Sequence, residues 1–381
     1  MAKLGEVCIQ ITDGSHNPPS GVEQSEYLML SSKNIDDDFI TLDSPRFLSH
    51  SDYIAENKRT TVSEGDLLMT IVGTIGRVAI VPEELKGICL QRSVAVIKPE
   101  REVVNNRYLM YQLQNMRPFL EKEARGVAQK GIYLKQVSQL DIKLPELEHQ
   151  MQIVKVLDKA SKLIFLRRQQ LAKLDELVKA RFVEMFGDPV KNTMDWEIKP
   201  LSELGELNRG VSKARPRNSP ELLGGPYPLI QTGEVANAKT YITSFNSTYS
   251  EKGLAQSKMW PKGTLCITIA ANIAQTSILT FDACFPDSVV GFISRNMTNE
   301  LFIHYWFSFF QKILDEQAPQ VAQKNINLKI LSELNVIVPP LSLQNRFAAF
   351  VEHVDQQKQT VQQSLEKLEL MKKALMQEYF G

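Results

Sequence analysis

The chain has 381 residues, and 43% of them are hydrophobic, which is enough for two or more domains with buried cores. Lysine plus arginine equals aspartate plus glutamate, 44 against 44, and this balance argues against a free-standing nucleic-acid binder. No apolar run reaches the ~18 residues of a membrane span, and the start lacks the hydrophobic stretch of a signal peptide. We therefore expect a cytoplasmic protein without a membrane partner.

The first notable segment is "TDGSHNPPS", residues 12–20. Asn-Pro-Pro followed by an aromatic residue is the catalytic tetrapeptide of amino-methylating DNA methyltransferases, in which the ring stacks on a flipped base. Here Ser20 takes the aromatic position, and only 16 residues precede Asn17, too few for a preceding cofactor-binding fold. Asp-Gly and Pro-Pro both favour turns, so we predict a proline-stiffened loop between strands.

Short β-rich runs follow, broken by glycine, proline and asparagine. Examples are "LLMTIV", "VAIVP" and "SVAVIKP", and the same character returns later in "TLCITIA" and "VVGFIS". These runs predict mixed α/β globules with many loops. The four cysteines are scattered, without a Cys-x-x-Cys pair or a histidine at ligand spacing, so we expect reduced, buried thiols and no metal. They are Cys8, Cys89, Cys266 and Cys284.

The chain repeats itself. "GVAQKGIYLKQVSQLDIKLPELEHQ" returns as "QVAQKNINLKILSELNVIVPPLSLQ", displaced by 194 positions (320 against 126). Upstream, "EGDLLMTIVGTIGRVAI" corresponds to "KGTLCITIAANIAQTSI", displaced by 198 positions (262 against 64). Phe-Gly closes both copies, at 186–187 and at 380–381. The sequence therefore predicts a tandem duplication with halves of roughly 1–187 and 188–381.

Each copy ends in a predicted long helix. Beyond "LPELEHQ" and "VPPLSLQ", apolar residues recur in steps of four and three, without glycine or proline before the closing Phe-Gly. This spacing predicts two coiled-coil helices of ~34 residues, each roughly 50 Å long. Arg167, Lys358 and Lys372 interrupt the seams. We expect the helices to pair antiparallel, with the globules at opposite ends and a pseudo-twofold axis that matches duplex DNA. On the seams alone, an ordinary oligomerisation coiled coil remains the alternative.

In the order of these blocks the chain resembles the specificity subunit of type I restriction-modification systems. "TDGSHNPP" resembles the opening of that family's target recognition domains, and "GTIGRVAIV" resembles a recurrent strand-turn-strand within them. "AQKNINLKILSELNVIVPPLSLQ" is similar to the junction between recognition domain and helix. The resemblance covers essentially the whole chain. One difference is that the first copy lacks a counterpart of "GDPVKNTMDWEIKP", so its domain begins abruptly.

The resemblance implies an α+β fold with two mixed α/β target recognition domains separated by two long antiparallel helices. Its boundaries would be 1–145 for the first recognition domain, 146–187 for the central helix, 188–338 for the second recognition domain and 339–381 for the C-terminal helix. It also implies a non-catalytic subunit that binds double-stranded DNA, two methylation subunits and restriction subunits. S-adenosylmethionine would lie on the methylation subunits, which methylate adenine N6, and ATP and Mg on the restriction subunits, with no cofactor on this chain.

Two other classes stay open. A stand-alone adenine-N6 DNA methyltransferase needs a cofactor-binding glycine turn, and neither "GTIG" nor "LLGGP" has the required strand-turn-helix context. A coiled-coil scaffold without DNA recognition would explain the helices but not two duplicated globules with polar loops. Within the family, the chain could serve a restriction-methylation fusion enzyme or act as an exchangeable partner.

Candidate DNA-binding residues lie in polar loops. The segment "NRGVSKARPRNSP" carries four basic residues with no acidic residue between Glu206 and Glu221, and it suits contacts with phosphates or guanine edges. A merely solvated loop is the alternative. In the first copy the corresponding loop offers His16 and Asn17. The four basic residues are Arg209, Lys213, Arg215 and Arg217.

A second group recurs just before each helix-leading strand, where a lysine follows a glutamine in both copies. Because turn chemistry does not require lysine twice, we predict phosphate contacts there. The residues are Gln129 and Lys130 in the first copy and Gln323 and Lys324 in the second. Weaker candidates flank the β-rich cores: Arg77 and Arg92 in the first copy and Gln275 in the second. Because the two globules diverge, they would read different sequences and give an asymmetric, bipartite target.

Overall fold

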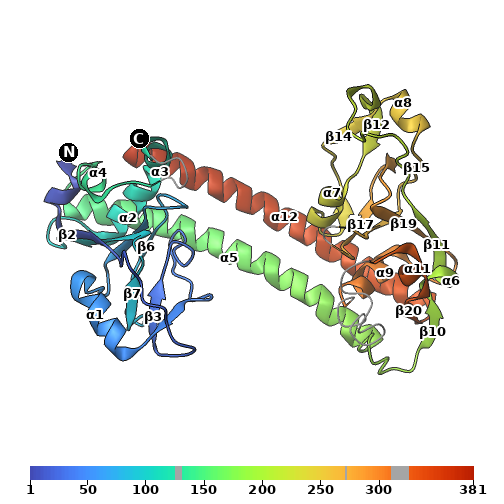
Figure 1. The fold of residues 1–381 in the computed structure, drawn as a ribbon, viewed down its shortest axis with the longest axis horizontal. Helices are drawn as coiled ribbons and strands as arrows, with labels where there is room; N and C mark the ends of the chain where they lie inside the picture. The colour runs from blue at the N-terminus through green and yellow to red at the C-terminus, as the bar shows by residue number, and fades with distance from the viewer. Residues whose placement is uncertain (125–130, 271–272, 310–325) are drawn as a thin grey trace. The chain divides into compact units, whose positions relative to one another are not determined.

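A computed structural model describes residues 1–124, 131–270, 273–309 and 326–381 (Figure 1). The chain forms two compact units, residues 1–168 with 363–381 and residues 169–362. Each unit therefore contains one globule and a part of each long helix. Among the described residues, no helix is long and apolar enough to cross a membrane.

The first globule is built on a four-stranded sheet and a three-stranded sheet. The four-stranded sheet has the order β2-β8-β5-β6 (Cys8–Asp13, Val94–Pro99, Leu67–Thr70 and Val78–Ile80). The three-stranded sheet has the order β4-β3-β7 (Arg46–Leu48, Tyr27–Leu30 and Ile88–Leu90). The helices are η1 (Leu4–Glu6), α1 (His50–Thr60), α2 (Asn106–Asn115), α3 (Arg117–Glu123) and α4 (Leu134–Ser138).

The second globule repeats this design with a larger main sheet. Its five-stranded sheet has the order β11-β19-β16-β17-β13 (Gly205–Arg209, Val289–Ser294, Leu265–Thr268, Thr276–Leu279 and Tyr241–Ile242). A four-stranded sheet has the order β14-β12-β18-β15 (Ser247–Tyr249, Leu223–Leu229, Ala283–Cys284 and Met259–Trp260). The helices are α6 (Leu201–Leu204), η2 (Pro220–Leu222), α7 (Thr232–Asn237), α8 (Glu251–Ala255), α9 (Glu300–Phe307) and α11 (Leu328–Glu333).

A short antiparallel strand pair joins each globule to its long helix. In the second copy, β10 (Glu197–Pro200) pairs with β20 (Asn335–Val338) over four residues. In the first copy, β1 (Ala2–Lys3) pairs with β9 (Asp141–Ile142) over two residues. The first domain thus has a terminal strand despite its abrupt start, but a shorter one.

The two predicted long helices are confirmed as α5 (Leu147–Phe186) and α12 (Leu341–Phe380), each of 40 residues. They pair antiparallel within each unit. In the first unit, Leu157 of α5 packs in one core with Phe380 of α12. In the second unit, Phe182 and Phe186 of α5 pack against Phe347 of α12. The α+β class and the tandem duplication are therefore confirmed, because both copies place the same elements on the same helix pair.

The burial of the cysteines follows the prediction with one exception. All four thiols are free, and Cys89, Cys266 and Cys284 are buried. Cys8 is only half-buried, so the prediction of burial was wrong for this residue, which lies at the first position of β2. Burial still raises the pKa of Cys8 and of Cys89 to about 12, so both remain protonated thiols at neutral pH.

Candidate nucleic-acid interface

In the first domain, three candidate loops lie at one end of the main sheet. Strands β2 and β8 are antiparallel, and so are β8 and β5. The end of β2, the start of β8 and the end of β5 therefore lie at the same end of the sheet. His16 and Asn17 follow β2, Arg92 precedes β8 and Arg77 closes the turn after β5. The fold thus brings together four candidates that are far apart in sequence.

A glycine makes the close approach of two of these loops possible. A Cβ on Gly14 would lie 2.1 Å from the carbonyl oxygen of Leu90, so only glycine fits here. The next residue, Ser15, donates its N–H to Leu90 at 2.7 Å and accepts the N–H of Arg92 at 2.9 Å. The loop with His16 is therefore fixed against the turn that carries Arg92. The stretch with Asn-Pro-Pro is a loop between β2 and β3, as predicted.

Some of the candidate side chains in the first domain have acidic neighbours. The Nε2 atom of His16 lies 2.8 Å from a carboxylate oxygen of Asp13, and the Nη1 atom of Arg77 lies 3.6 Å from a carboxylate oxygen of Asp36. His16 and Arg92 are exposed, and Arg77 is half-buried. These groups are placed to meet an anion at the surface, but His16 and Arg77 would do so in competition with a carboxylate.

The second domain repeats the arrangement. Strands β11, β19 and β16 are successive antiparallel neighbours, so the loop after Arg209, the turn before β19 and the turn before Gln275 share one end of the sheet. Gly210 is the counterpart of the first domain's loop glycine, because a Cβ there would lie 2.2 Å from the carbonyl oxygen of Phe285. The correspondence between the basic loop and the "TDGSHNPP" loop, predicted from their order in the copies, holds in the structure.

The hydrogen bonds that hold Arg77 and Gln275 to the preceding strands are equivalent in the two domains. The hydroxyl oxygen of Thr70 accepts a hydrogen bond from the backbone N–H of Arg77 at 2.9 Å, and the backbone N–H of Thr70 donates to the carbonyl oxygen of Arg77 at 2.9 Å. Thr268 and Gln275 form the same two hydrogen bonds, each at 3.0 Å. The alignment with a displacement of 198 positions is therefore correct here, and Arg77 and Gln275 occupy one structural position.

Each of these turns borders a cavity. In the first domain the cavity has a volume of about 450 Å³ and is lined by Arg77, Arg117 and Glu121 with the turn itself. In the second domain the cavity has a volume of about 540 Å³, and its lining includes Gln275 and His304. Burial, together with the nearby positive charge of Lys358, lowers the pKa of His304 to about 4, so this imidazole is neutral at pH 7.

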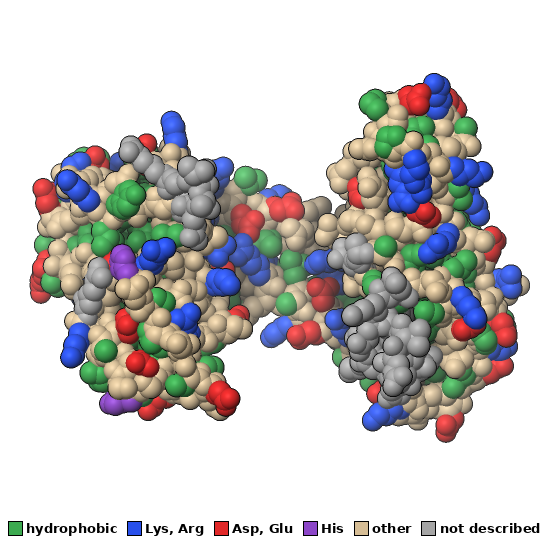
Figure 2. All heavy atoms as spheres, viewed as in Figure 1, with side chains coloured by type: hydrophobic (Ala, Val, Ile, Leu, Met, Phe, Trp, Pro, Cys, Tyr) green, Lys and Arg blue, Asp and Glu red, His purple; other side chains and the backbone are tan. Residues whose placement is uncertain are grey.

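The basic loop of the second domain is not free of acidic neighbours in space. Arg217 Nη2 lies 2.6 Å from one oxygen of Asp287, and Arg215 Nη2 lies 3.8 Å from the other. The absence of acidic residues between Glu206 and Glu221 therefore did not mean that the loop keeps its full positive charge. The neutralising carboxylate comes from a turn 70 positions beyond Arg217. Figure 2 shows lysine and arginine side chains gathered over the part of the second domain that contains β12 and β15.

The other two basic residues of this loop, Arg209 and Lys213, are both exposed. The backbone N–H of Lys213 donates to the side-chain carbonyl of Gln256 at 2.7 Å, which anchors the loop to the end of α8. Four further candidates, Gln129, Lys130, Gln323 and Lys324, lie outside the described residues.

The structure adds two basic residues that sequence reasoning missed. The Nε atom of Arg117, on α3, donates to the carbonyl of Gly76 at 3.2 Å and so lies directly behind the turn with Arg77. The Lys258 ammonium lies 4.0 Å from the centre of the Trp260 ring, an attractive cation–π geometry, and 4.0 Å from a carboxylate oxygen of Glu206. Its neighbour Trp260 was the available sequence signal for Lys258, whereas a single arginine in a helix gives none.

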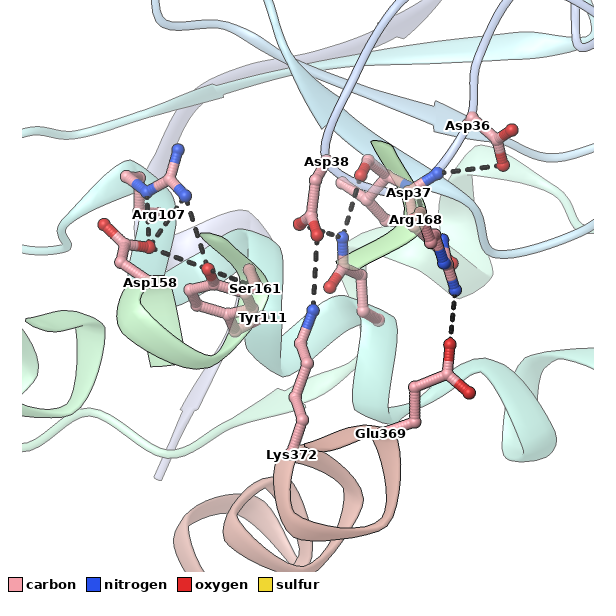
Figure 3. A network of polar contacts seen from close by, with 12 residues as sticks. Asp36, Asp37, Asp38, Arg107, Tyr111, Asp158, Ser161, Arg168, Glu369 and Lys372 are labelled. Carbon is pink, nitrogen blue, oxygen red and sulfur yellow. Dashed lines mark hydrogen bonds and ion pairs between the residues drawn. The ribbon is translucent and has the colours of Figure 1, made fainter. Parts of the chain in front are cut away.

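An acidic loop connects the first domain's turn to α12 (Figure 3). Its three consecutive carboxylates each meet a different cation: Asp36 pairs with Arg77, Asp37 with Arg117 and Asp38 with Lys372. The Asp38–Lys372 distance is 3.2 Å, and both side chains are mostly buried. Lys372, the polar residue in the apolar seam of α12, therefore binds this acidic loop through Asp38.

Comparison with known proteins identifies the family. The model of the type I restriction modification DNA specificity domain matches residues 29–176 and again residues 193–370, so the chain belongs to this family. A putative type I restriction enzyme MjaX specificity subunit from Methanocaldococcus jannaschii is 23% identical over 85% of this chain and 80% of its own length. The EcoBI specificity subunit from Escherichia coli is 36% identical over 26% of this chain and 21% of its own length.

Solved structures share the fold. A type I restriction-modification S subunit from M. genitalium has a TM-score of 0.58 at 14% identity, with 100% of this chain and 95% of that chain covered. A chain from work on complex assembly and conformational transition of the type I R-M system has a TM-score of 0.57 at 18% identity, with 100% and 96% covered. Family membership makes this chain a DNA specificity subunit and not a catalyst, so the Asn-Pro-Pro stretch is a loop of a recognition domain. The methyltransferase and scaffold alternatives are set aside.

Proposed function

We propose that each domain reads one half of an asymmetric, bipartite target in double-stranded DNA. The observation that carries this proposal is the repeated sheet end, where the same three loops carry different polar side chains in the two copies. At equivalent places the first domain offers His16, Asn17 and Arg77, and the second offers Arg215, Arg217 and Gln275. The shared backbone supports one docking mode, and the different side chains support different base sequences.

The chain would act together with partners. Two methylation subunits carrying S-adenosylmethionine would methylate adenine N6 at the target, and restriction subunits using ATP and Mg would cleave unmodified DNA, while this chain binds no cofactor itself. Formal neutrality, 44 basic against 44 acidic residues, favours this division, because the partners can neutralise most phosphates. The complex would work in the cytoplasm, where the host chromosome is modified.

A domain exchange tests the proposal. We would replace Gly205 to Leu334, from the start of β11 to the residue before β20, with the matching segment of another family member, which leaves β10, β20 and both long helices intact. Methylome sequencing of a host that expresses the hybrid with its methylation subunit should show a bipartite N6-methyladenine motif with one half changed. The parent chain is the control. A motif with both halves changed, or with neither changed despite a folded hybrid, would contradict two independent readers.

A further inference from the structure

The two domains place opposite charges at one equivalent turn position. Residues 91–94 form a turn closed by a 3.0 Å hydrogen bond from the fourth N–H to the first carbonyl, and residues 286–289 form the same turn with the same 3.0 Å bond. Each turn leads into the equivalent central strand, β8 or β19. The second residue of the turn is Arg92 in the first domain and Asp287 in the second.

The surrounding loops show the reverse charge order. In the first domain the acid, Asp13, lies at the end of β2 beside His16, and the turn supplies the base. In the second domain the loop after β11 supplies Arg215 and Arg217, and the turn supplies the acid. Both domains therefore hold acid and base together at the same sheet end, but the elements that supply them are exchanged.

The contact between the turn and the basic loop is built into the backbone. The close approach of Gly210 to the carbonyl oxygens of Phe285 and Pro286 presses the start of the loop against this turn. The two arginines that follow can then reach the single carboxylate of Asp287, at 2.6 and 3.8 Å. The side chain of Asp287 is 38% exposed, so DNA can reach the ion pair that Asp287 forms with the two arginines.

We propose that Asp287 is a selectivity residue of the second domain, a counterion that Arg215 and Arg217 must give up in order to bind DNA. This inference rests on the proposed function. Every duplex offers phosphates, so unpaired arginines would bind any sequence. A carboxylate at their tips competes with phosphate and repels it. At the correct target, hydrogen bonds from the arginines to base edges offset the loss of the ion pair. Asp287 therefore weakens non-specific binding more than specific binding.

The test uses the assembled complex with its methylation subunits and three chains: wild type, Asp287→Asn, and Glu197→Gln as the matched control. Glu197 pairs with Lys199 at 3.2 Å on β10, so its substitution removes the same charge from the same unit without touching the basic loop. Binding is measured by fluorescence anisotropy over a salt series. One duplex contains the motif that methylome sequencing identifies, and the other is a scrambled duplex of equal length. Thermal unfolding followed by circular dichroism checks that the variants fold. We expect little change in stability, because a solvent-exposed ion pair contributes little to it.

We expect Asp287→Asn to bind the scrambled duplex about tenfold more tightly at low salt, with a salt slope steeper by about one unit, because one more phosphate is neutralised. Affinity for the target should change less, so the specificity ratio falls, and Arg215→Ala with Arg217→Ala added should abolish the gain. Identical behaviour of Asp287→Asn and Glu197→Gln would overturn the inference, and so would weaker target binding with unchanged scrambled binding, which means that Asp287 only positions the arginines. If wild type shows no preference for the target, the proposed function fails instead.

Discussion

At the scale of single residues, two buried glutamines explain why the repeated block ends in glutamine. The side-chain oxygen of Gln150, on α5, accepts the N–H of Asn105 at 2.8 Å, and its amide donates to the carbonyls of Pro145 at 2.8 Å and of Val103 at 3.3 Å. Gln344, on α12, accepts and donates in the same way at the equivalent place. Each glutamine thus ties the first turns of a long helix to the cap of the globule's own helix.

Replacing Gln150 with alanine should therefore destabilise the first unit. The substitution leaves one N–H and two carbonyl groups without their partner in a site where Gln150 is 0% exposed. We expect a loss of roughly 2 to 4 kcal/mol in the free energy of unfolding, measured by urea denaturation. Gln152→Ala, at an exposed position of the same helix, is the control and should change stability little. Equal effects of both substitutions would show that the hydrogen bonds of Gln150 contribute nothing specific.

The candidate site shows what can be predicted at this scale. Loop membership of Arg215, Arg217 and His16 followed from local sequence, because glycine and proline mark turns. The pairing of the two arginines with Asp287 could not, because it depends on strand order and on the close packing of Gly210. Charge within a segment is a local property, whereas neutralisation depends on what the fold places opposite.

At the scale of elements, the long helices and the β-rich runs were predictable, because β5, β6, β8, β16 and β19 lie in those runs, and the strands of two residues were not. Apolar steps of four and three with no breaker predicted both long helices at ~34 residues, and the observed α5 and α12 are longer, at 40 residues each. Even the polar interruption at Lys372 has a structural partner in Asp38. Strands of two residues, such as β13 and β18, carry too little pattern to be assigned. Their partners are set by long-range packing, which no local window contains.

The acidic loop allows a test of how α12 is held on the first globule. Asp38→Asn should remove the attraction to Lys372 while retaining a residue that tolerates the positive φ of 71° at this position. We expect amide hydrogen exchange in residues 369–380 to become several-fold faster, because a mostly buried ammonium loses its carboxylate partner. Mass spectrometry of the exchanged peptides provides the measurement.

Asp36→Asn is the matched control, since it changes the same loop but only its pair with Arg77, which is longer, at 3.6 Å, and more exposed than the pair of Asp38 with Lys372. That substitution should leave exchange in the last turns of α12 as in wild type. If Asp36→Asn and Asp38→Asn accelerate exchange equally, the effect comes from the loop as a whole and not from the contact with Lys372.

At the scale of the whole molecule, duplication gives one chain two versions of the same interface. Both long helices run from one unit into the other, so each globule packs on the start of its own helix and the end of the other copy's helix. The repeat itself was readable from the sequence because the helix blocks match closely. The equivalence of Arg92 and Asp287 was not, because these two positions carry different side chains and the Ser-Val that follows each of them is too short a match to align the turns.

The helices also suggest what sets the gap in a bipartite target. Matched insertions of four residues, between Arg168 and Gln169 in α5 and between Gln362 and Gln363 in α12, fall at the boundaries between the two units and keep each unit intact. Each insertion adds about one turn, a rise of ~6 Å with ~40° of rotation. Since duplex DNA rises ~3.4 Å per base pair, the unspecified gap should grow by one or two base pairs while both half-sites stay unchanged.

Methylome sequencing of the matched variant beside the parent measures the gap directly. An insertion in α5 alone is the informative companion, because it lengthens one helix of an antiparallel pair and should impair methylation by forcing the seam out of register. If the matched variant methylates efficiently with the parent's gap, the helices do not set the spacing. The partner subunits would then have to fix it, and the four-residue change would be absorbed without moving the DNA-reading loops relative to the target.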